Sequence, residues 1–239
     1  LLGANNERLA PVPVKNRFAQ THADITAWRH HLHTIPELQY DVHRTVAFVE
    51  EKLRSFGIEN ITTGVGQTGL VAVIEGAQDT QGRVIGLRAD MDALPIPEQT
   101  GLEYASKTPG AMHACGHDGN MSMVLVTAGL MARFKDRFSG NIKFMFQPAE
   151  EMPGGAKPMI EAGILENPHV DYSVAAHLWP GLPAGTMGLK AGVLMSAASF
   201  FEIEITGNHI GSAHLRNVLL YFIGCECERC SRHARRTSR

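Results

Sequence analysis

Residue types that bind divalent metals gather in four short segments of this 239-residue chain. The densest segment, residues 112–118, combines one cysteine, two histidines and an aspartate. Each of the other three follows an apolar run of strand length, and together they contain Asp90, Asp92, Glu150, Glu151 and His177. Thiolate, imidazole and carboxylate ligands in combination suit zinc or a neighbouring first-row divalent ion. The four segments therefore predict a metal site.

Each segment taken alone has an ordinary structural explanation. An Asp-x-Asp pair is commonly a loop or a helix cap, adjacent glutamates are commonly a solvated surface pair, and a single histidine commonly packs in a core. Their coincidence at the ends of apolar runs favours a shared site, because an unpaired buried charge is costly. An open α/β sheet binds its ligands at the carboxyl ends of its strands.

The elements that must position these segments are predicted from the spacing of apolar residues. We expect helices over residues 20–34, 41–56 and 119–135. We expect strands over residues 70–74, 84–87, 142–146 and 172–176. Continuous apolar runs of this kind are typical of strands that are covered on both faces. The alternation predicts the α/β class, with a three-layer α/β/α domain around a largely parallel or mixed sheet.

Composition and charge exclude several classes of protein. A chain that is 44% hydrophobic and 19% charged can form a core, unlike a disordered tail, a collagen-like repeat or a coiled coil. The net charge of −2 gives no electrostatic reason to expect a nucleic-acid partner. No stretch reaches the roughly 18 apolar residues of a membrane span, and residues 1–10 do not resemble a signal peptide. Because Cys115 stands alone in residues 1–207, we expect a reducing, cytoplasmic location.

Five motifs occur in register with those of a known family. They cover residues 31–38, 87–95, 112–118, 146–151 and 176–179. In this order they resemble the hippurate hydrolase and auxin-conjugate hydrolase branch of the aminoacylase/carboxypeptidase-type metallo-amidohydrolases, over about residues 20–206. The resemblance implies a zinc-peptidase-like catalytic domain that hydrolyses the amide bond of N-acyl amino acids such as hippurate. The expected partner is this small-molecule substrate, with no nucleic acid and no membrane.

The resemblance also implies a role for each residue of the site. Two divalent ions (zinc, manganese, cobalt or nickel) would be held by Cys115, His117, Glu151 and His177, with Cys115 as a candidate bridge. Glu150 would be the general base, and Asp92 would be a carboxylate that orients a ligand or the base. Metal ions of this kind lower the pKa of a bound water and polarise the amide carbonyl. The base then accepts the proton of the water and returns it to the leaving amine.

The end of the sequence departs from the family pattern. We expect the catalytic domain to occupy residues 1–193, the first strand of a lid domain residues 194–207, and an unrelated tail residues 208–239. The tail carries six arginines against two glutamates and three of the four cysteines, Cys225, Cys227 and Cys230. A frameshifted terminus explains this change more simply than a small zinc knot does. The chain would then lack most of the lid and one later metal-binding histidine. We therefore expect low or absent activity, and a family-type homodimer only with an intact lid.

Three alternatives compete with the hydrolase hypothesis. The chain could be an inactive metal-binding fragment of such an enzyme, or a peptidase of the same superfamily that accepts peptides instead of acyl amino acids. A thiol-based redox role for the C-terminal cysteines is more distant.

The remaining candidate residues are expected to have structural roles. His30, His31 and His33 are expected at the surface or in packing, Asp118 as a cap of the following helix, and Asp90 as a structural carboxylate. The glycine-rich residues 64–69 are expected to form a turn before the strand at residue 70.

Overall fold

The computed structural model describes residues 12–78, 82–195, 198–199 and 224–225. Contacts divide the chain into two compact units, Leu1–Pro180 and Gly181–Arg239. In the second unit, the described residues include a short antiparallel pair of strands, β6 (Ala198–Ser199) and β7 (Gly224–Cys225). Residues 200–207 of the expected lid strand lie outside the described residues, and the predicted domain limits at 193 and 207 stay predictions.

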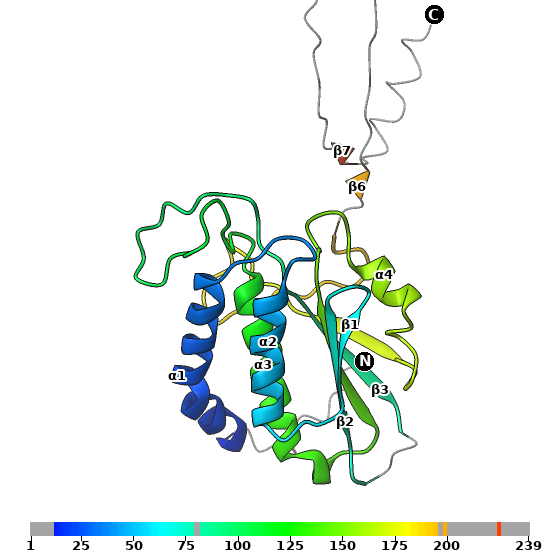
Figure 1. The fold of residues 1–239 in the computed structure, drawn as a ribbon. Coiled ribbons are helices and arrows are strands. Elements are labelled where there is room, and N and C mark those ends of the chain that lie inside the picture. The colour runs from blue at the N-terminus through cyan, green and yellow to red at the C-terminus, as the bar shows by residue number, and fades with distance from the viewer. Residues whose placement is uncertain (1–11, 79–81, 196–197, 200–223, 226–239) are drawn as a thin grey trace, which may run out of the picture. The chain divides into compact units, whose positions relative to one another are not determined.

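The first unit is built on a five-stranded mixed sheet (Figure 1). Its strands, in spatial order, are β1 (Ile61–Val65), β2 (Gly69–Glu75), β4 (Asn141–Gln147), β3 (Val84–Asp90) and β5 (Tyr172–Ala175). The pairs β1–β2 and β2–β4 are antiparallel, whereas β4, β3 and β5 run parallel to one another. The predicted α/β class with a mixed central sheet is confirmed.

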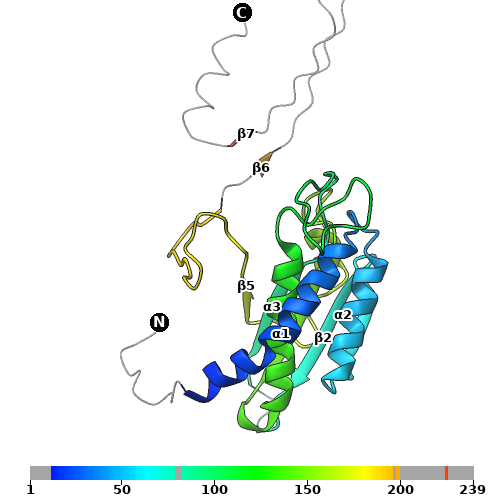
Figure 2. The ribbon, with the colours of Figure 1, turned by 90° about the vertical axis from the view of Figure 1, so that its left-hand side faces the viewer.

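Helices pack on both faces of the sheet, as Figure 1 shows, and Figure 2 views the layer of three helices on one face. On one face lie α1 (Val12–Thr34), α2 (His43–Ser55) and α3 (His117–Arg133), and on the other lies α4 (Ala156–Glu161). Strand β2 contributes side chains to the packing on both faces of the sheet, because successive side chains of a strand point to opposite faces. Its Leu70, Ala72 and Ile74 join the large core beneath the helices, while Val71 packs with Met159 of α4.

The predicted elements match the structure apart from a few differences. Helix α4, which is only six residues long, was not predicted. Helix α1 begins at Val12 instead of residue 20; its Pro13 falls in the first turn, where proline is tolerated. Strand β1 was not predicted, because its sequence Ile-Thr-Thr-Gly-Val is short and mostly exposed. The turn expected within residues 64–69 does precede β2. The expectation that the strand at 172–176 is covered on both faces is wrong for β5: it is an edge strand and its four residues are exposed.

Parallel pairing brings three strand ends to one edge of the sheet. The last residues of β3 and β4, Asp90 and Gln147, are direct partners in the register, and Ala175 of β5 is paired with Arg88. The chain therefore leaves the sheet at neighbouring points before it reaches the acidic and histidine segments. Helix α3 begins at His117 beside the same edge (Figure 1).

A buried lysine stabilises the connection that follows α4. Lys143 of β4 is 2% exposed, and its Nζ donates hydrogen bonds to the carbonyl oxygens of Ile164, Glu166 and Pro168 at 2.7–2.9 Å. Burial lowers the pKa of this ammonium group. The three carbonyl groups make a buried charge tolerable here, because each supplies a hydrogen-bond acceptor.

Replacing this lysine with an apolar residue of similar length is expected to destabilise the protein. Lys143→Met leaves three carbonyl groups without their donor, which should lower the free energy of unfolding by about 2–4 kcal/mol. Urea unfolding followed by far-ultraviolet circular dichroism measures the change. Lys157→Met, at an exposed position of α4, is the matched control. Equal midpoints for the two variants would contradict this role of Lys143.

Candidate metal centre

His117 lies at the centre of the candidate site and has one ring nitrogen without a partner. The residue is fully buried, and its Nδ1 lies 2.7 Å from the backbone oxygen of Asp92. Because a carbonyl oxygen only accepts, Nδ1 carries the proton and Nε2 carries a lone pair. Within the part of the chain that the structure describes, Nε2 has no hydrogen-bond partner, and it lies 3.6–3.8 Å from one oxygen each of Asp90, Glu150 and Glu151. An unpaired buried imidazole facing three carboxyl groups is an arrangement that a cation would satisfy.

Asp92 holds the turn that carries the two glutamates. Its Oδ1 accepts the backbone N–H of Glu150 at 2.8 Å, and its Oδ2 accepts that of Glu151 at 3.1 Å. Burial raises the pKa of Asp92, and the two backbone N–H groups act against this rise. Both carboxylate oxygens are therefore committed to the turn, which agrees with an orienting role better than with direct metal ligation.

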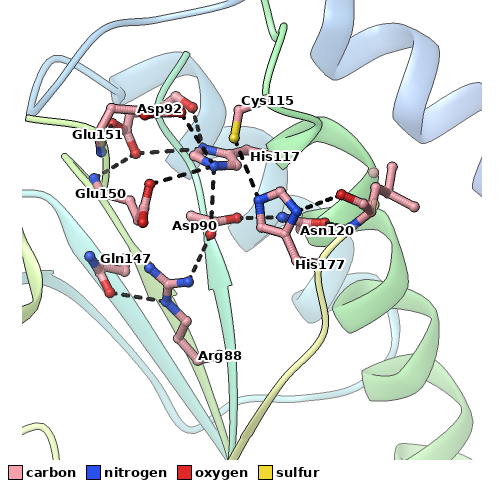
Figure 3. Close-up of polar contacts among 12 residues, drawn as sticks. Arg88, Asp90, Asp92, Cys115, His117, Asn120, Gln147, Glu150, Glu151 and His177 are labelled. Carbon is pink, nitrogen blue, oxygen red and sulfur yellow. Dashed lines mark hydrogen bonds and ion pairs between the residues drawn. The ribbon is translucent and has the colours of Figure 1, made fainter. Parts of the chain in front are cut away.

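Glu150 and Glu151 follow β4 through a sharp change of direction. Ala149 adopts a left-handed conformation with φ of +52°, and both glutamates come close to the ring of His117 (Figure 3). Burial raises the pKa of Glu150, which makes its carboxylate a better proton acceptor. Oε1 of Glu151 is buried and has no hydrogen-bond partner. The two adjacent carboxylates thus face one imidazole from the same turn.

Cys115 and His177 lie on another side of His117. The Sγ of Cys115 and the Nε2 of His177 are 3.5 Å apart. Nδ1 of His177 bonds to the backbone oxygen of Leu178 at 2.6 Å, so Nε2 carries the lone pair. Burial raises the pKa of the Cys115 thiol to about 12, and the carboxylate of Glu151 adds to the rise. The thiol is therefore neutral unless a cation stabilises its thiolate.

These side chains form two groups that could each hold a metal ion and that share His117 (Figure 3). In each group the donor atoms lie within 4.8 Å of one another, and the groups are Cys115, His117 and His177, and Asp90, His117 and Glu150. The first group offers sulfur and nitrogen donors, which suit zinc and its first-row neighbours. Together with the unpaired Nε2 of His117, this donor set fits a divalent metal.

The structure brings together all six residues to which the sequence assigned a role. The four predicted ligands, the predicted base and Asp92 gather at the carboxyl edge of the sheet. Asp90, expected to be structural, accepts hydrogen bonds from Arg88 at 2.7 Å and from Asn120 at 2.8 Å. It nevertheless belongs to the second ligand group.

Gly116 lies between Cys115 and His117, and its backbone makes the bend from which both side chains reach the site. It is the N-cap of α3 and has a φ of +94°, a backbone angle that residues with a side chain rarely adopt. The other histidine of this segment, His113, is buried, and neither of its ring nitrogens has a hydrogen-bond partner among the described residues. Burial lowers the pKa of His113 to about 4, so the ring is neutral at physiological pH.

The expectation that His33 packs inside the fold is confirmed: it is buried, and its Nδ1 also lies 2.7 Å from Oδ2 of Asp118. The expectation that Asp118 caps the helix is confirmed in part: Gly116 is the N-cap, but Oδ1 of Asp118 accepts the backbone N–H of Gly119 in the first turn at 2.9 Å. Oδ2 of Asp118 also accepts a hydrogen bond from Nε of Arg29 at 2.9 Å. This pairing ties α1 to the first turn of α3, next to His117.

Arg88, Asn120 and Gln147 also belong to the site, although their roles were not predicted from the sequence. Nε of Arg88 donates to Oε1 of Gln147 at 3.0 Å, so the ends of β3 and β4 are linked through side chains. The position of Asn120, three residues after His117 on the same helix face, was the available signal.

The fold and the candidate metal-ligand cluster are of the kind found in a metallopeptidase-type α/β domain. The model of the Peptidase family M20/M25/M40 matches residues 86–233, more than half of the chain, and the protein belongs to this family. Among the described residues, no helix is long and apolar enough to cross a membrane.

Several relatives show what kinds of protein the chain resembles. An N-acyl-L-amino acid amidohydrolase of Geobacillus stearothermophilus is 44% identical over 81% of this chain and 51% of its own length. An N-acetyl-L-cysteine deacetylase of Bacillus subtilis is 45% identical over 75% of this chain and 42% of its own length. The Bacillus subtilis YXEP protein, described as a dinuclear metal binding peptidase from the M20 family, superposes with a TM-score of 0.72 at 40% identity, over 77% of this chain and 51% of its own. The chain spans about half the length of the curated relatives it matches.

Removing the charge of Asp92 is expected to weaken metal binding. In Asp92→Asn the amide accepts at one oxygen only, so one backbone N–H of the glutamate turn loses its acceptor. Zinc affinity should fall about 10–100-fold, as measured by chelator competition. The reference chain for this and later metal measurements carries serine at positions 225, 227 and 230, so that the C-terminal cysteines cannot bind metal. Asp41→Asn, at an exposed position, is the control, and unchanged affinity of Asp92→Asn would contradict the orienting role.

The His33–Asp118 pair is expected to make stability depend on pH. The hydrogen bond to Asp118 raises the pKa of His33 above its usual 6.5. The contribution of the pair is therefore fully present below the unfolded pKa of about 6.5 and is lost as the pH rises through the folded pKa. The measurement is the midpoint of urea unfolding of the unmodified chain and of His33→Gln, both with a metal chelator present. The difference between the two midpoints should become smaller above neutral pH. His22→Gln, at an exposed position, is the control, and a difference that grows with pH would refute the assignment.

Proposed function

We propose that this chain carries the catalytic site of a metal-dependent hydrolase that cleaves the amide bond of N-acyl amino acids, including aromatic acyl substrates such as hippurate. The observation that carries the proposal is the unpaired Nε2 of His117, buried between a thiol, a second imidazole and three carboxyl groups. The names of the amidohydrolase and deacetylase relatives support the substrate class.

Four side chains would hold the metal. Cys115, His117, Glu151 and His177 offer one sulfur, two imidazole nitrogens and a carboxylate, a set that suits two ions of zinc, manganese, cobalt or nickel. The solved relative described as a dinuclear metal binding peptidase supports the number of ions. When bound, such ions lower the pKa of a water and polarise the amide carbonyl. A reducing, cytoplasmic compartment would keep the Cys115 thiol available as a ligand.

Glu150 would act as the general base. Its side chain is 38% exposed, more than that of Glu151, so a water and a substrate can reach it. Its raised pKa favours acceptance of a proton from the attacking water and its return to the leaving amine. Asp92 holds the backbone N–H groups of both glutamates, so their carboxylates keep their positions while Glu150 changes its protonation state.

A peptidase is the second candidate, and one observation favours it. Thermostable carboxypeptidase 1 of Saccharolobus solfataricus is 42% identical over 81% of this chain and 49% of its own length. The same site chemistry cleaves either an acyl amide or a peptide bond. Substrate choice would distinguish the two enzymes, while metal binding would not.

Metal binding and turnover are tested separately on the full chain. The purified protein is loaded with zinc or manganese, its metal content is measured, and it is assayed with N-acetyl amino acids, hippurate and dipeptides. Glu150→Gln is expected to bind metal normally and to lose turnover by about 10²–10⁴-fold, because the amide cannot accept a proton. Glu161→Gln, exposed on α4, is the control.

Each result of this experiment bears on one part of the proposal. A chain that binds no metal contradicts the proposed site. A chain that binds metal but turns over none of the substrates contradicts the hydrolase proposal and supports a metal-binding fragment. Faster turnover of dipeptides than of acyl amino acids favours the peptidase, and unchanged turnover in Glu150→Gln excludes Glu150 as the base.

A further inference from the structure

Asn120 connects two segments of the candidate site that are distant in the sequence. It is 1% exposed and lies in the first turn of α3. Its Nδ2 donates to Oδ1 of Asp90 at 2.8 Å, and its Oδ1 accepts the backbone N–H of Leu178 at 3.1 Å. This orientation of the amide is required, because a backbone N–H only donates and an ionised carboxylate only accepts. Both ends of the side chain are therefore used (Figure 3).

The segment that Asn120 holds is otherwise exposed. All four residues of β5 are exposed, and His177 and Leu178 follow it after one intervening residue. The described side-chain contacts of His177 are the Sγ of Cys115 at 3.5 Å and the neighbouring carbonyl of Leu178, together with aromatic-ring contacts to His117 and Trp179. An exposed histidine with so few side-chain contacts keeps its position in the site only if its backbone is fixed.

The start of α3 provides that fixed point. A Cβ at Gly119 would lie 2.3 Å from Cδ1 of Leu178, so Leu178 occupies the space that a side chain at position 119 would take. The hydrogen bond from Leu178 N–H to Asn120 lies beside this contact. The backbone and the side chain of Leu178 therefore both contact α3, the helix that begins at His117.

We propose that Asn120 is a positioning residue that holds His177 in the metal-ligand group with Cys115 and His117. The role rests on the proposed function, because its effect is exerted on the metal. Loss of the Asn120 amide leaves the N–H of Leu178 without its acceptor and lets His177 move away from Cys115. The carboxylates of the glutamate turn, which Asp92 holds separately, keep their places.

A double-mutant cycle on metal affinity tests this role. Cobalt and zinc affinities are measured by chelator competition for the reference chain with serine at 225, 227 and 230, and for Asn120→Ala, His177→Ala and the double variant. Each single variant is expected to bind about 10–100-fold more weakly. Because Asn120 acts through His177, the double variant should bind no more weakly than His177→Ala alone. Thr127→Ala, which removes another side-chain hydrogen bond from α3, should bind like the reference chain.

The cobalt spectrum distinguishes a displaced ligand from a damaged fold. In Asn120→Ala the ligand-field bands should match those of His177→Ala, while the charge-transfer absorption of the Cys115 thiolate is retained. Loss of the thiolate band in Asn120→Ala, or multiplicative effects of the two substitutions on affinity, would show that Asn120 acts on more than His177 and would overturn the role.

Hydrogen exchange tests the contact in the unmodified chain and does not depend on the folding of a variant. The Leu178 amide should exchange at least about tenfold more slowly than its intrinsic rate, because Asn120 accepts its proton. Exchange at the intrinsic rate overturns the proposal. A reference chain that binds no cobalt overturns the proposed function and this role with it, whereas equal affinities of the reference chain and Asn120→Ala overturn only the role of Asn120.

Discussion

The candidate site depends on Asp92, which joins three separate segments of the chain. Its backbone oxygen fixes the Nδ1 proton of His117, and its carboxylate accepts the backbone N–H groups of Glu150 and Glu151. The end of β3, the start of α3 and the turn after β4 are thereby held against one another. The same bonds set the chemistry, since they leave the Nε2 lone pair of His117 unpaired and direct it toward the carboxylates.

The location of the site could be predicted from local sequence because the fold concentrates it at strand ends. The apolar runs belong to strands that end at Asp90, Gln147 and Ala175, and parallel pairing places these ends at one edge of the sheet. The polar residues at and after these strand ends are the ones that converge on His117. The roles given to Cys115, Glu150 and the other ligands came from the resemblance, and they stay predictions that the geometry supports.

What could not be predicted lies in contacts between distant residues. His33 and Asp118 are 85 positions apart, and Asn120 is 30 from Asp90 and 58 from Leu178, so no local period signals these pairs. The exposure of β5 was missed for a related reason: an apolar run predicts a strand but does not say which neighbours cover it. Strand β1 was missed because two threonines and a glycine among five mostly exposed residues give neither an apolar run nor an alternation.

The most direct test of the metal centre is X-ray absorption spectroscopy of the zinc-loaded chain, with serine at positions 225, 227 and 230 so that Cys115 is the remaining thiol. If Cys115 is a ligand, the spectrum should show a sulfur scatterer at about 2.3 Å together with imidazole nitrogens at about 2.0 Å. The sulfur shell should disappear in Cys115→Ser. A zinc environment of oxygen and nitrogen alone in the Cys115-containing chain would exclude Cys115 as a ligand and contradict the proposed metal centre.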